Sequence, residues 1–560
     1  MSKKINKVKV SFPGTSSEEV TGSMVLIETK TKKILVECGL WQGSGTLLQE
    51  YKNNSKRFPF KAKEINYVIL LHGHADHTMR VPLLYKRGCE ADIIAPIGLK
   101  SIYKAMGEDS AFIIKRNSDD LSKKFNKEYE PIYDREDVLN SLRYWKEYPL
   151  NQKIQIDEDI EIRFIESGHI LNACQCELWV KNNNRTVKIG ITSDLGNTKV
   201  KQYYTNEFKP IEKANLLIGE CTYGDTARGI KKADRKKDLE KIKTIIETYC
   251  VERKGKVLIP CFALQRGQAI LTHLYNIFGK NDDFDVPVII DSALMLKMND
   301  VFLQELQGPD YECFEEVMNW KNIRRVEDFL ETSAWVNSNA PAIFVSCGGM
   351  LQAGRAVYTA TKLLQKEDSC IIFCGYSVEG SLGWKIKNAT KNHIRIDGKN
   401  VPCRCNVIDL KYSFILSLIP FQRLSLINDS NSSTPSLLMS TKRDSPSRTL
   451  SISLIVISLG SLAKVYPPCA PFLPIIIPDF LNAENICSKY LSDMFCLFDI
   501  VFKVTLSFSE FITRSISAFI PYLPLVEIFK PSPLYKLVIA YSFINNPLNY
   551  NIFLNLIPVY

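Results

Sequence analysis

Long apolar segments are missing from this sequence of 560 residues. The N-terminus, MSKKINKVKV, has no apolar stretch of the kind that forms a signal peptide. Later apolar runs are interrupted by Ser or Pro before they reach the roughly 20 residues of a membrane-spanning helix. We therefore expect a protein that does not associate with a membrane.

Regular cysteine spacing and a strong charge imbalance are also missing. The 16 cysteines are scattered, unlike those of a small disulfide-stapled scaffold, so we expect a reducing, cytoplasmic location. The net charge of +10 favours a polyanionic partner, but it is too small an excess on so long a chain to identify one. The 45% hydrophobic and 24% charged residues are those of an ordinary soluble globular protein.

Apolar runs that end in polar residues recur through the first part of the chain. Between Val8 and Cys38 such runs alternate with turn residues, which predicts antiparallel strands. A run from Tyr67 to Leu71 ends directly in a histidine cluster, and EIRFIESGHI, VKIGITSDLGN and ANLLIGECTYGD repeat the pattern. Loops at strand ends usually carry catalytic groups, so we expect these loops to meet at one rim.

From about residue 220 to 387 the pattern becomes alternating helix and strand. KVLIPCF, VPVIID, PAIFVSC and CIIFCG are predicted buried strands, separated by helical segments such as KKDLEKIKTIIETYC. This alternation is typical of an α/β unit with a mostly parallel sheet.

The strongest single pattern is the hexapeptide HGHADH at residues 72–77, which holds three of the six histidines in the chain. Imidazole and carboxylate groups are good zinc ligands, and a polar surface loop is the alternative interpretation. His72 and His74 alternate along an extended loop and can bind one metal, whereas Asp76 and His77 follow the turn and can reach a second.

A two-metal site needs further ligands, including a carboxylate that bridges ions about 3.5–4 Å apart. His169 in SGHIL and Asp194 in SDLGN each follow an apolar strand, where such ligands are expected. Taken singly, His169 could equally serve another purpose, and Asp194 could form a simple turn before Leu195 and Gly196.

Together these residues resemble the zinc motif of the metallo-β-lactamase superfamily, HxHxDH followed by a distant His and a distant Asp. The resemblance implies an α/β fold, the αββα sandwich of that family. It also implies two zinc ions, one held by His72, His74, His169 and Asp194, the other by Asp76, His77 and the bridging Asp194.

The resemblance extends over about residues 8–409 to the β-CASP branch of RNA-processing nucleases, of bacterial or archaeal type and related to the cleavage and polyadenylation endonuclease. EVTGS and ECGLWQG look like its first motif, with Glu37 in place of the usual Asp, and ECTYGD puts Glu220 at the acidic motif that opens the inserted domain. KVLIPCFALQRGQAIL, VPVIIDSALMLK, SCGGMLQAGRA and FCGYSVEGSLGWKI follow in family order.

Two glycines and two arginines of these blocks are candidate substrate contacts. Gly348 and Gly349 suit a backbone that comes close to another group, such as a phosphate held by free amides, although ordinary strand-end turns are the alternative. Arg266 and Arg355 are candidate phosphate contacts or, equally, solvated surface charges.

The chain departs from the family in two places. Family members have a histidine near the GGMLQAGR-like or GYSVEGSLG-like block that can protonate the leaving oxygen, and here that role is vacant or passes to Tyr358 or Lys385. A GHA- or SHA-like motif should also complete the second zinc site after IRIDGKNVPCRCNVIDLK, but no histidine follows His393, so the second site is incomplete.

The composition changes abruptly after this point. From Tyr412 onward Gly460 is the only glycine, charges are sparse, and prolines lie within the apolar runs. We predict an aberrant, low-order C-terminal tail over 412–560 that is not a functional domain and arises from a reading-frame change or misjoined coding sequence.

The predicted domains are therefore a metallo-β-lactamase core at 1–205, a β-CASP insert at 206–390, a truncated return to the core at 391–411, and the tail. The expected activity is zinc-dependent cleavage of single-stranded RNA, with Asp76, Glu220 and Tyr358 as catalytic residues. The alternatives are a catalytically impaired RNA-binding relative and a hydrolase of small esters or thioesters. A homodimer is an open option for its assembly.

Overall fold

A computed structural model gives the fold of the chain. The structure describes residues 8–14, 21–42, 46–182, 185–196, 201–222, 235–352, 354–375, 377–389, 392–396, 398–410, 436–441, 535–539 and 554–558. The chain divides into two units, Met1–Ala470 and Pro471–Tyr560. The second unit is described only as an antiparallel pair, β21 (Tyr535–Ile539) and β22 (Leu554–Pro558).

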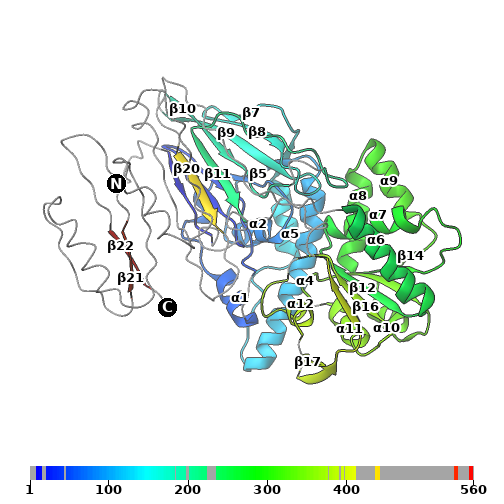
Figure 1. Ribbon diagram of the computed structural model, residues 1–560. Helices are drawn as coiled ribbons and strands as arrows, with labels where there is room; N and C mark the ends of the chain where they lie inside the picture. Colours follow the sequence, from blue (N-terminus) through cyan, green and yellow to red (C-terminus); the bar gives the residue numbers. More distant parts are fainter. Residues whose placement is uncertain are drawn as a thin grey trace, which may run out of the picture. The chain divides into compact units, whose positions relative to one another are not determined.

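Two six-stranded sheets form the first domain of the larger unit (Figure 1). One sheet consists of β1 (Lys9–Ser11), β2 (Val25–Glu28), β3 (Lys33–Val36), β4 (Tyr67–Ile69), β5 (Asp92–Pro96) and β6 (Trp145–Tyr148) in that order. The other runs β20 (Ser436–Thr441), β11 (Leu216–Cys221), β10 (Arg185–Ile191), β9 (Cys174–Asn182), β8 (Ile160–Glu166) and β7 (Ile154–Asp157). The predicted antiparallel start is confirmed, because β1, β2 and β3 pair antiparallel.

Alternating side chains explain why these two sheets stack. Ile27, Ile34 and Ile69 of the first sheet are fully buried against Ile162 and Phe164 of the second. The opposite face of the first sheet buries Leu35, Val68 and Ile93 beneath helices. These helices are α1 (Leu47–Ser55), η1 (Ala62–Glu64), α2 (Ala75–Thr78), α3 (Val81–Lys86), α4 (Leu99–Phe125), α5 (Arg135–Ser141) and η2 (Leu142–Tyr144).

The inserted domain, called the insert below, is built on a third sheet whose strands are all parallel, as predicted. Its order is β14 (Ile323–Val326), β13 (Val288–Asp291), β15 (Ala342–Cys347), β12 (Lys256–Cys261), β16 (Cys370–Phe373) and β19 (Asn406–Asp409). Its helical segments are α6 (Arg235–Ile246), the π-helical η3 (Glu247–Glu252), α7 (Arg266–Phe278), α8 (Ala293–Glu305), α9 (Gly308–Met318), α10 (Phe329–Asn337), α11 (Arg355–Leu363) and α12 (Leu382–Lys387). The helix predicted from KKDLEKIKTIIETYC corresponds to α6 and η3.

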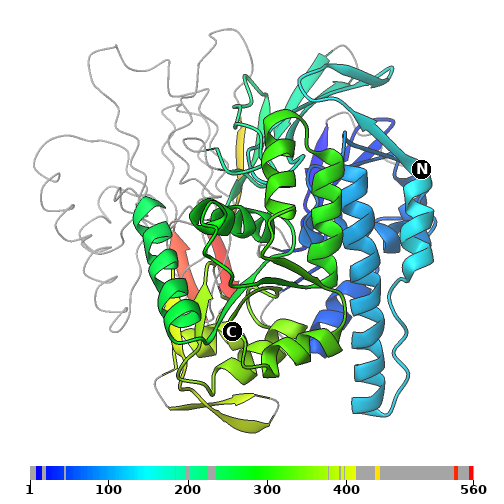
Figure 2. The same cartoon turned by 90° about the vertical axis from the view of Figure 1, so that its right-hand side faces the viewer.

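The long helix α4 connects the two domains. Figure 2 shows α4, in light blue, running beside the green helices of the insert. The Ser101 hydroxyl, in α4, donates a hydrogen bond of 2.6 Å to Glu305 at the end of α8. The two domains also share one continuous hydrophobic core.

The structure corrects the expected domain boundaries. The first domain does not end at residue 205, because β11 (Leu216–Cys221) pairs in parallel with β10. The described residues of the segment 391–411 do not return to that domain. They form the hairpin of β17 (His393–Ile396) and β18 (Lys399–Pro402) and the strand β19, which completes the sheet of the insert.

Most of the predicted tail, 412–560, lies outside the described residues. One described strand within it, β20, pairs in parallel with β11 over six residues. A short segment of the predicted tail therefore forms the edge strand of the second sheet. None of the helices in the described part of the chain combines the length and the apolar character of a membrane span.

Candidate metal centre

The HGHADH loop, residues 72–77, changes conformation in its middle, as the sequence predicts. β4 ends at Ile69, and His74 is extended (ψ 149°) at the N-cap of the short helix α2. The Thr78 hydroxyl donates a hydrogen bond of 2.8 Å to the carbonyl of His74 and closes the turn. His72 and His74 therefore precede the helix, whereas Asp76 and His77 lie within it.

Two glycines allow the loops of the site to meet. A Cβ on Gly39 would lie 1.6 Å from the carbonyl oxygen of Asp76, and a Cβ on Gly196 would lie 1.7 Å from that of Gly168. Only glycine can accept such an approach without movement of the backbone. The loop after β3 is thus held against residues 72–77, and the loop after β10 against the loop that carries His169.

Four predicted ligands form one compact group. One ligand atom each from His72, His74, His169 and Asp194 lies within 4.8 Å of all the others. His169 Nε2 is 3.2 Å from His74 Nδ1 and 3.4 Å from Asp194 Oδ2, and His72 Nε2 is 3.7 Å from the same oxygen. Tetrahedral ligands at zinc–nitrogen distances of about 2.0–2.1 Å are separated by about 3.3–3.4 Å. The four atoms therefore fit around a single zinc-sized ion.

The surroundings of these histidines also suit a metal. Burial lowers the pKa of His74 well below its usual value and that of His169 to about 3, so both imidazoles are neutral. His72 Nε2 is buried and has no hydrogen-bond partner. A buried, unpartnered lone pair is costly unless another group satisfies it, and a cation would do so.

The remaining predicted ligands lie beside this group. His77 Nε2 is 3.4 Å from Asp194 Oδ1 and 3.7 Å from Asp76 Oδ2. The two oxygens of Asp194 thus face different histidines, as a bridging carboxylate would. Burial opposes protonation of His77, but the charges of Glu37, Asp194 and Asp76 raise its pKa to about 10.

Glu37 lies behind the histidines. Its Oε2 is 2.7 Å from His77 Nδ1 and accepts a hydrogen bond of 2.6 Å from Ser23, while its Oε1 accepts one from Ser193. Burial favours the neutral acid, but the neighbouring histidines hold the pKa of Glu37 well below its usual range. Glu37, His72 and His77 could also form a group of ligands by distance, but the contact of Glu37 with His77 is that of a hydrogen bond.

Glu220 lies behind Asp194. Its Oε1 accepts a hydrogen bond of 2.9 Å from the backbone N–H of Leu195. Burial and the nearby charge of Asp194 raise the pKa of Glu220 to about 7. The side chain is thus placed to hold the loop that presents Asp194, and its predicted catalytic role stays a prediction.

The predicted substrate contacts have different surroundings. Arg266 begins α7, and its charge is among those that lower the pKa of His169, so it lies near the metal group. The guanidinium of Arg355 instead donates hydrogen bonds to Asp291, Thr332 and three backbone carbonyls of the insert, those of Val326, Glu327 and Asp328.

The backbone amides of Gly348 and Gly349 do not form a row that is free to bind a phosphate. The N–H of Gly348 donates a hydrogen bond of 3.0 Å to the carbonyl of Cys261, and its φ of 113° requires glycine. A Cβ on Gly349 would meet its nearest backbone atom at 3.5 Å, an ordinary contact. The turn explanation therefore accounts for Gly348 better than a phosphate contact does.

Tyr358, on α11, is engaged by the neighbouring helix. Its hydroxyl lies 3.0 Å from that of Ser333 and accepts a hydrogen bond of 3.2 Å from the amide of Asn337, both in α10. The two remaining histidines belong to neither group of metal ligands. His273 is buried in α7 against Tyr203, and His393 is exposed on β17.

Sequence reasoning missed two residues of the site. Ser193 contacts both Glu37 and His72, and Gln265 connects the insert to the His169 loop. Both have positive φ, 50° and 72°, which is unusual for residues other than glycine. Neither residue type signals that conformation, so the sequence offered no sign of them.

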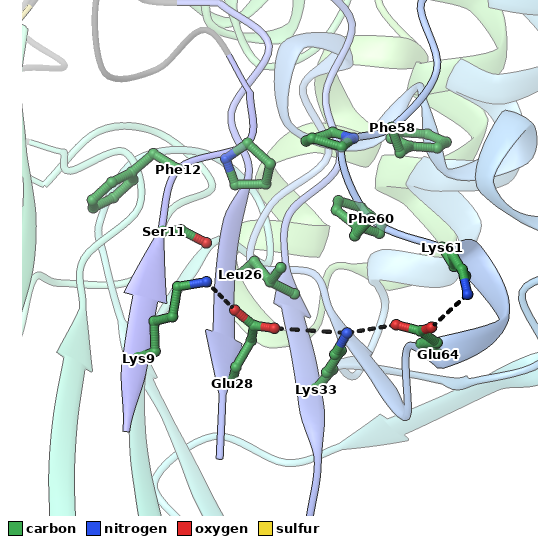
Figure 3. Close-up of a pocket in the computed structure, with 12 residues that line it drawn as sticks. Lys9, Ser11, Phe12, Leu26, Glu28, Lys33, Phe58, Phe60, Lys61 and Glu64 are labelled. Atoms are coloured by element: carbon green, nitrogen blue, oxygen red, sulfur yellow. Dashed lines mark hydrogen bonds and ion pairs between the residues drawn. The ribbon is translucent and has the colours of Figure 1, made fainter. Parts of the chain in front are cut away.

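A separate pocket of about 820 Å³ lies over β1, β2 and β3 (Figure 3). Phe12, Phe58 and Phe60 line it, and none of the predicted site residues does. Its charged groups form a chain of ion pairs with one another, drawn as dashed lines, from Lys9 through Glu28, Lys33 and Glu64 to Lys61.

Comparison with known proteins finds matches to two protein families and to several relatives. Residues 18–133 match the metallo-beta-lactamase superfamily, and residues 267–386 match the Beta-Casp domain. A ribonuclease of Thermus thermophilus is 26% identical over 70% of this chain and 85% of its own length. An RNase J-like protein of Methanocaldococcus jannaschii is 28% identical over 71% and 84%. Cleavage and polyadenylation specificity factor subunit 3 of Dictyostelium discoideum is 27% identical over 72% and 49%.

Proposed function

Because the chain belongs to the metallo-β-lactamase superfamily and to its β-CASP branch, we propose that it is a zinc-dependent hydrolase that cuts phosphodiester bonds in single-stranded RNA. Relatives named as ribonucleases support the substrate class. The observation that carries the proposal is the convergence of His72, His74, His169 and Asp194 from three separate loops.

Zinc suits this set of ligands because neutral imidazoles and a carboxylate are its usual protein ligands. When bound, zinc supplies Lewis acidity and lowers the pKa of water toward neutrality. We propose His72, His74, His169 and Asp194 for one ion, and Asp76, His77 and Asp194 for a second. Since no histidine follows His393 in this sequence, the second set has one ligand fewer than the family resemblance implies.

Asp76 is the proposed group that orients the attacking water. Its side chain is 21% exposed, whereas that of His77 beside it is 6% exposed. A carboxylate at the boundary between the buried ligands and solvent can accept a hydrogen bond from water and aim it. Asp76 would therefore act on the reacting water directly, in addition to any contact with metal.

Residues of the insert are proposed to hold the substrate. Arg266 would contact a phosphate near the site, because a guanidinium pairs well with phosphate oxygens. Phe262, four residues earlier, is 47% exposed and could stack on a base of any sequence. Tyr358 could donate a proton to the substrate only after its hydroxyl breaks its hydrogen bonds to Ser333 and Asn337 of α10.

We propose that the protein acts in the cytoplasm. The 12 cysteines whose side chains the structure describes are free thiols, as expected in a reducing compartment. A homodimer is also proposed, although none of the described residues identifies its interface.

Cleavage of labelled RNA tests the function. The zinc-loaded chain should cut single-stranded RNA in preference to duplex RNA and to a small thioester. Asp76→Asn should lose about 10²–10⁴-fold in rate. His393→Ala, which removes an exposed histidine on β17, is the matched control and should keep the parent rate.

Two other results would replace the proposal. Turnover of the thioester but not of RNA would indicate the small-ester hydrolase. Binding of RNA without zinc-dependent cleavage would indicate the impaired RNA-binding relative, which the missing histidine after His393 favours.

A further inference from the structure

Ser193 connects two residues of the site that do not contact each other at hydrogen-bond distance. Its hydroxyl donates a hydrogen bond to Glu37 Oε1, and the hydroxyl oxygen of Ser193 itself lies 3.1 Å from His72 Nδ1. The direct distance from Glu37 Oε1 to His72 Nδ1 is 3.6 Å, too long for a good hydrogen bond. The hydroxyl therefore bridges the carboxylate and the imidazole.

The direction of these hydrogen bonds follows from the number of protons available. An ionised carboxylate can only accept, so the single proton of the Ser193 hydroxyl must point to Glu37. The hydroxyl oxygen can then only accept from His72, whose Nδ1 must carry a proton. The imidazole that binds a metal is the neutral form, which has one N–H, so a proton on Nδ1 leaves the lone pair on Nε2.

That lone pair lies where the ion is proposed. His72 Nε2 lies 3.7 Å from Oδ2 of Asp194, another member of the ligand group, and is buried without a hydrogen-bond partner. The opposite tautomer would place a proton at Nε2 and prevent metal binding through that atom. Fixing the tautomer before the metal arrives would therefore favour binding.

We propose that Ser193 is a positioning residue of the metal centre: its hydroxyl couples the carboxylate of Glu37 to His72 and holds this imidazole in the Nδ1–H tautomer. The inference rests on the proposed metal centre and adds a residue to it.

The backbone at both ends of the bridge is unusual. Glu37 has φ 61° and Ser193 has φ 50°, in the left-handed region that is strained for residues other than glycine. Ser193 directly precedes the proposed ligand Asp194, so the backbone conformation of Ser193 determines the direction in which the chain enters Asp194. A glycine would relax this strain but would lose the hydroxyl.

The tautomer of His72 can be measured without metal and without substrate. The chain has six histidines, so ¹⁵N-histidine labelling gives few signals to assign. The metal-free parent should show His72 with its proton on Nδ1, and Ser193→Gly should shift it toward the Nε2–H form. Ser23→Ala is the matched control, because its hydroxyl donates to the other oxygen of Glu37 and touches no histidine within hydrogen-bond distance. It should leave the His72 signal unchanged.

Zinc affinity, measured by competition with a chelator, gives the second readout. Ser193→Gly and Ser193→Ala should both weaken binding by about 10–100-fold, whereas Ser23→Ala should have little effect. In a His72→Ala background, Ser193→Gly should cause no further loss, because the residue through which it acts is gone.

Three results would overturn the role of Ser193: an Nε2–H tautomer in the parent, an unchanged tautomer in Ser193→Gly, or an equal loss of affinity in the His72→Ala background. A parent that binds no zinc would overturn the metal centre and this role together. Retained zinc without RNA cleavage would overturn only the proposed substrate.

Discussion

Gln265 of the insert holds the loop that carries His169. Its side-chain oxygen accepts a hydrogen bond of 2.9 Å from the backbone N–H of Leu171, and its amide donates one of 2.6 Å to the carbonyl of Tyr203. The insert thus contributes to the geometry of the metal centre as well as to the proposed substrate surface.

Gln265→Ala should therefore weaken zinc binding as well as the fold. It leaves the buried N–H of Leu171 without an acceptor, which costs about 1–3 kcal/mol. The His169 loop should loosen, and zinc affinity measured by chelator competition should fall. Gln268→Ala is the control, because this buried residue of the same helix bonds to Ala263 and Asn299 and not to the His169 loop. Equal zinc affinities in the two variants would contradict the connection.

Substitutions should show that Arg355 stabilises the fold and that Arg266 binds substrate. Arg355→Ala leaves Asp291 buried without its cation and should lower the free energy of unfolding by about 3–5 kcal/mol. Arg266→Ala should weaken RNA binding and reduce its dependence on salt, because a phosphate contact is lost. Thermal unfolding and RNA titration at two salt concentrations measure both effects. The assignment fails if Arg355→Ala is as stable as the parent.

Glu220 should make the stability of the metal-free protein depend on pH. Its pKa is about 7 in the folded chain, above the ordinary value of 4.5, so the folded state holds this proton more tightly than the unfolded state does. The resulting stability is present at low pH and is lost as the pH rises through 7. Glu220→Gln removes the repulsion from Asp194 and still offers an acceptor to Leu195.

The melting temperature of Glu220→Gln should exceed that of the parent by a few degrees at pH 8, on the order expected for 1–2 kcal/mol. The gain should shrink toward zero at pH 5, where the parent side chain is protonated in the fold. Equal shifts at both pH values would show that the substitution acts through something other than the charge of Glu220.

The sequence was informative where the chemistry is local. Three histidines in six residues after an apolar run are rare enough to predict a metal-binding loop, and strand-end positions correctly brought His169 and Asp194 to it. The parallel sheet of the insert followed from the alternation of apolar strands and helices. These features depend on residues close together in the chain.

Features that depend on distant contacts could not be predicted. The orientation of Arg355 follows from carbonyl groups of the β14–α10 segment, which the sequence does not place beside it. β19 joins the insert because it pairs with β16, although its sequence alone equally suits the first domain. Ser193 and Gln265 have positive φ, a conformation that a sequence normally signals with glycine, so nothing in the sequence pointed to them.

Elemental analysis of zinc in the purified chain tests the metal centre most directly. The parent should contain at least one zinc ion per chain, and His74→Ala and Asp194→Ala should each lose it, while His393→Ala keeps the parent content. If the parent holds two zinc ions, Asp194→Ala should lose both, because its two oxygens face both groups of proposed ligands. Unchanged zinc content in both His74→Ala and Asp194→Ala would contradict the account.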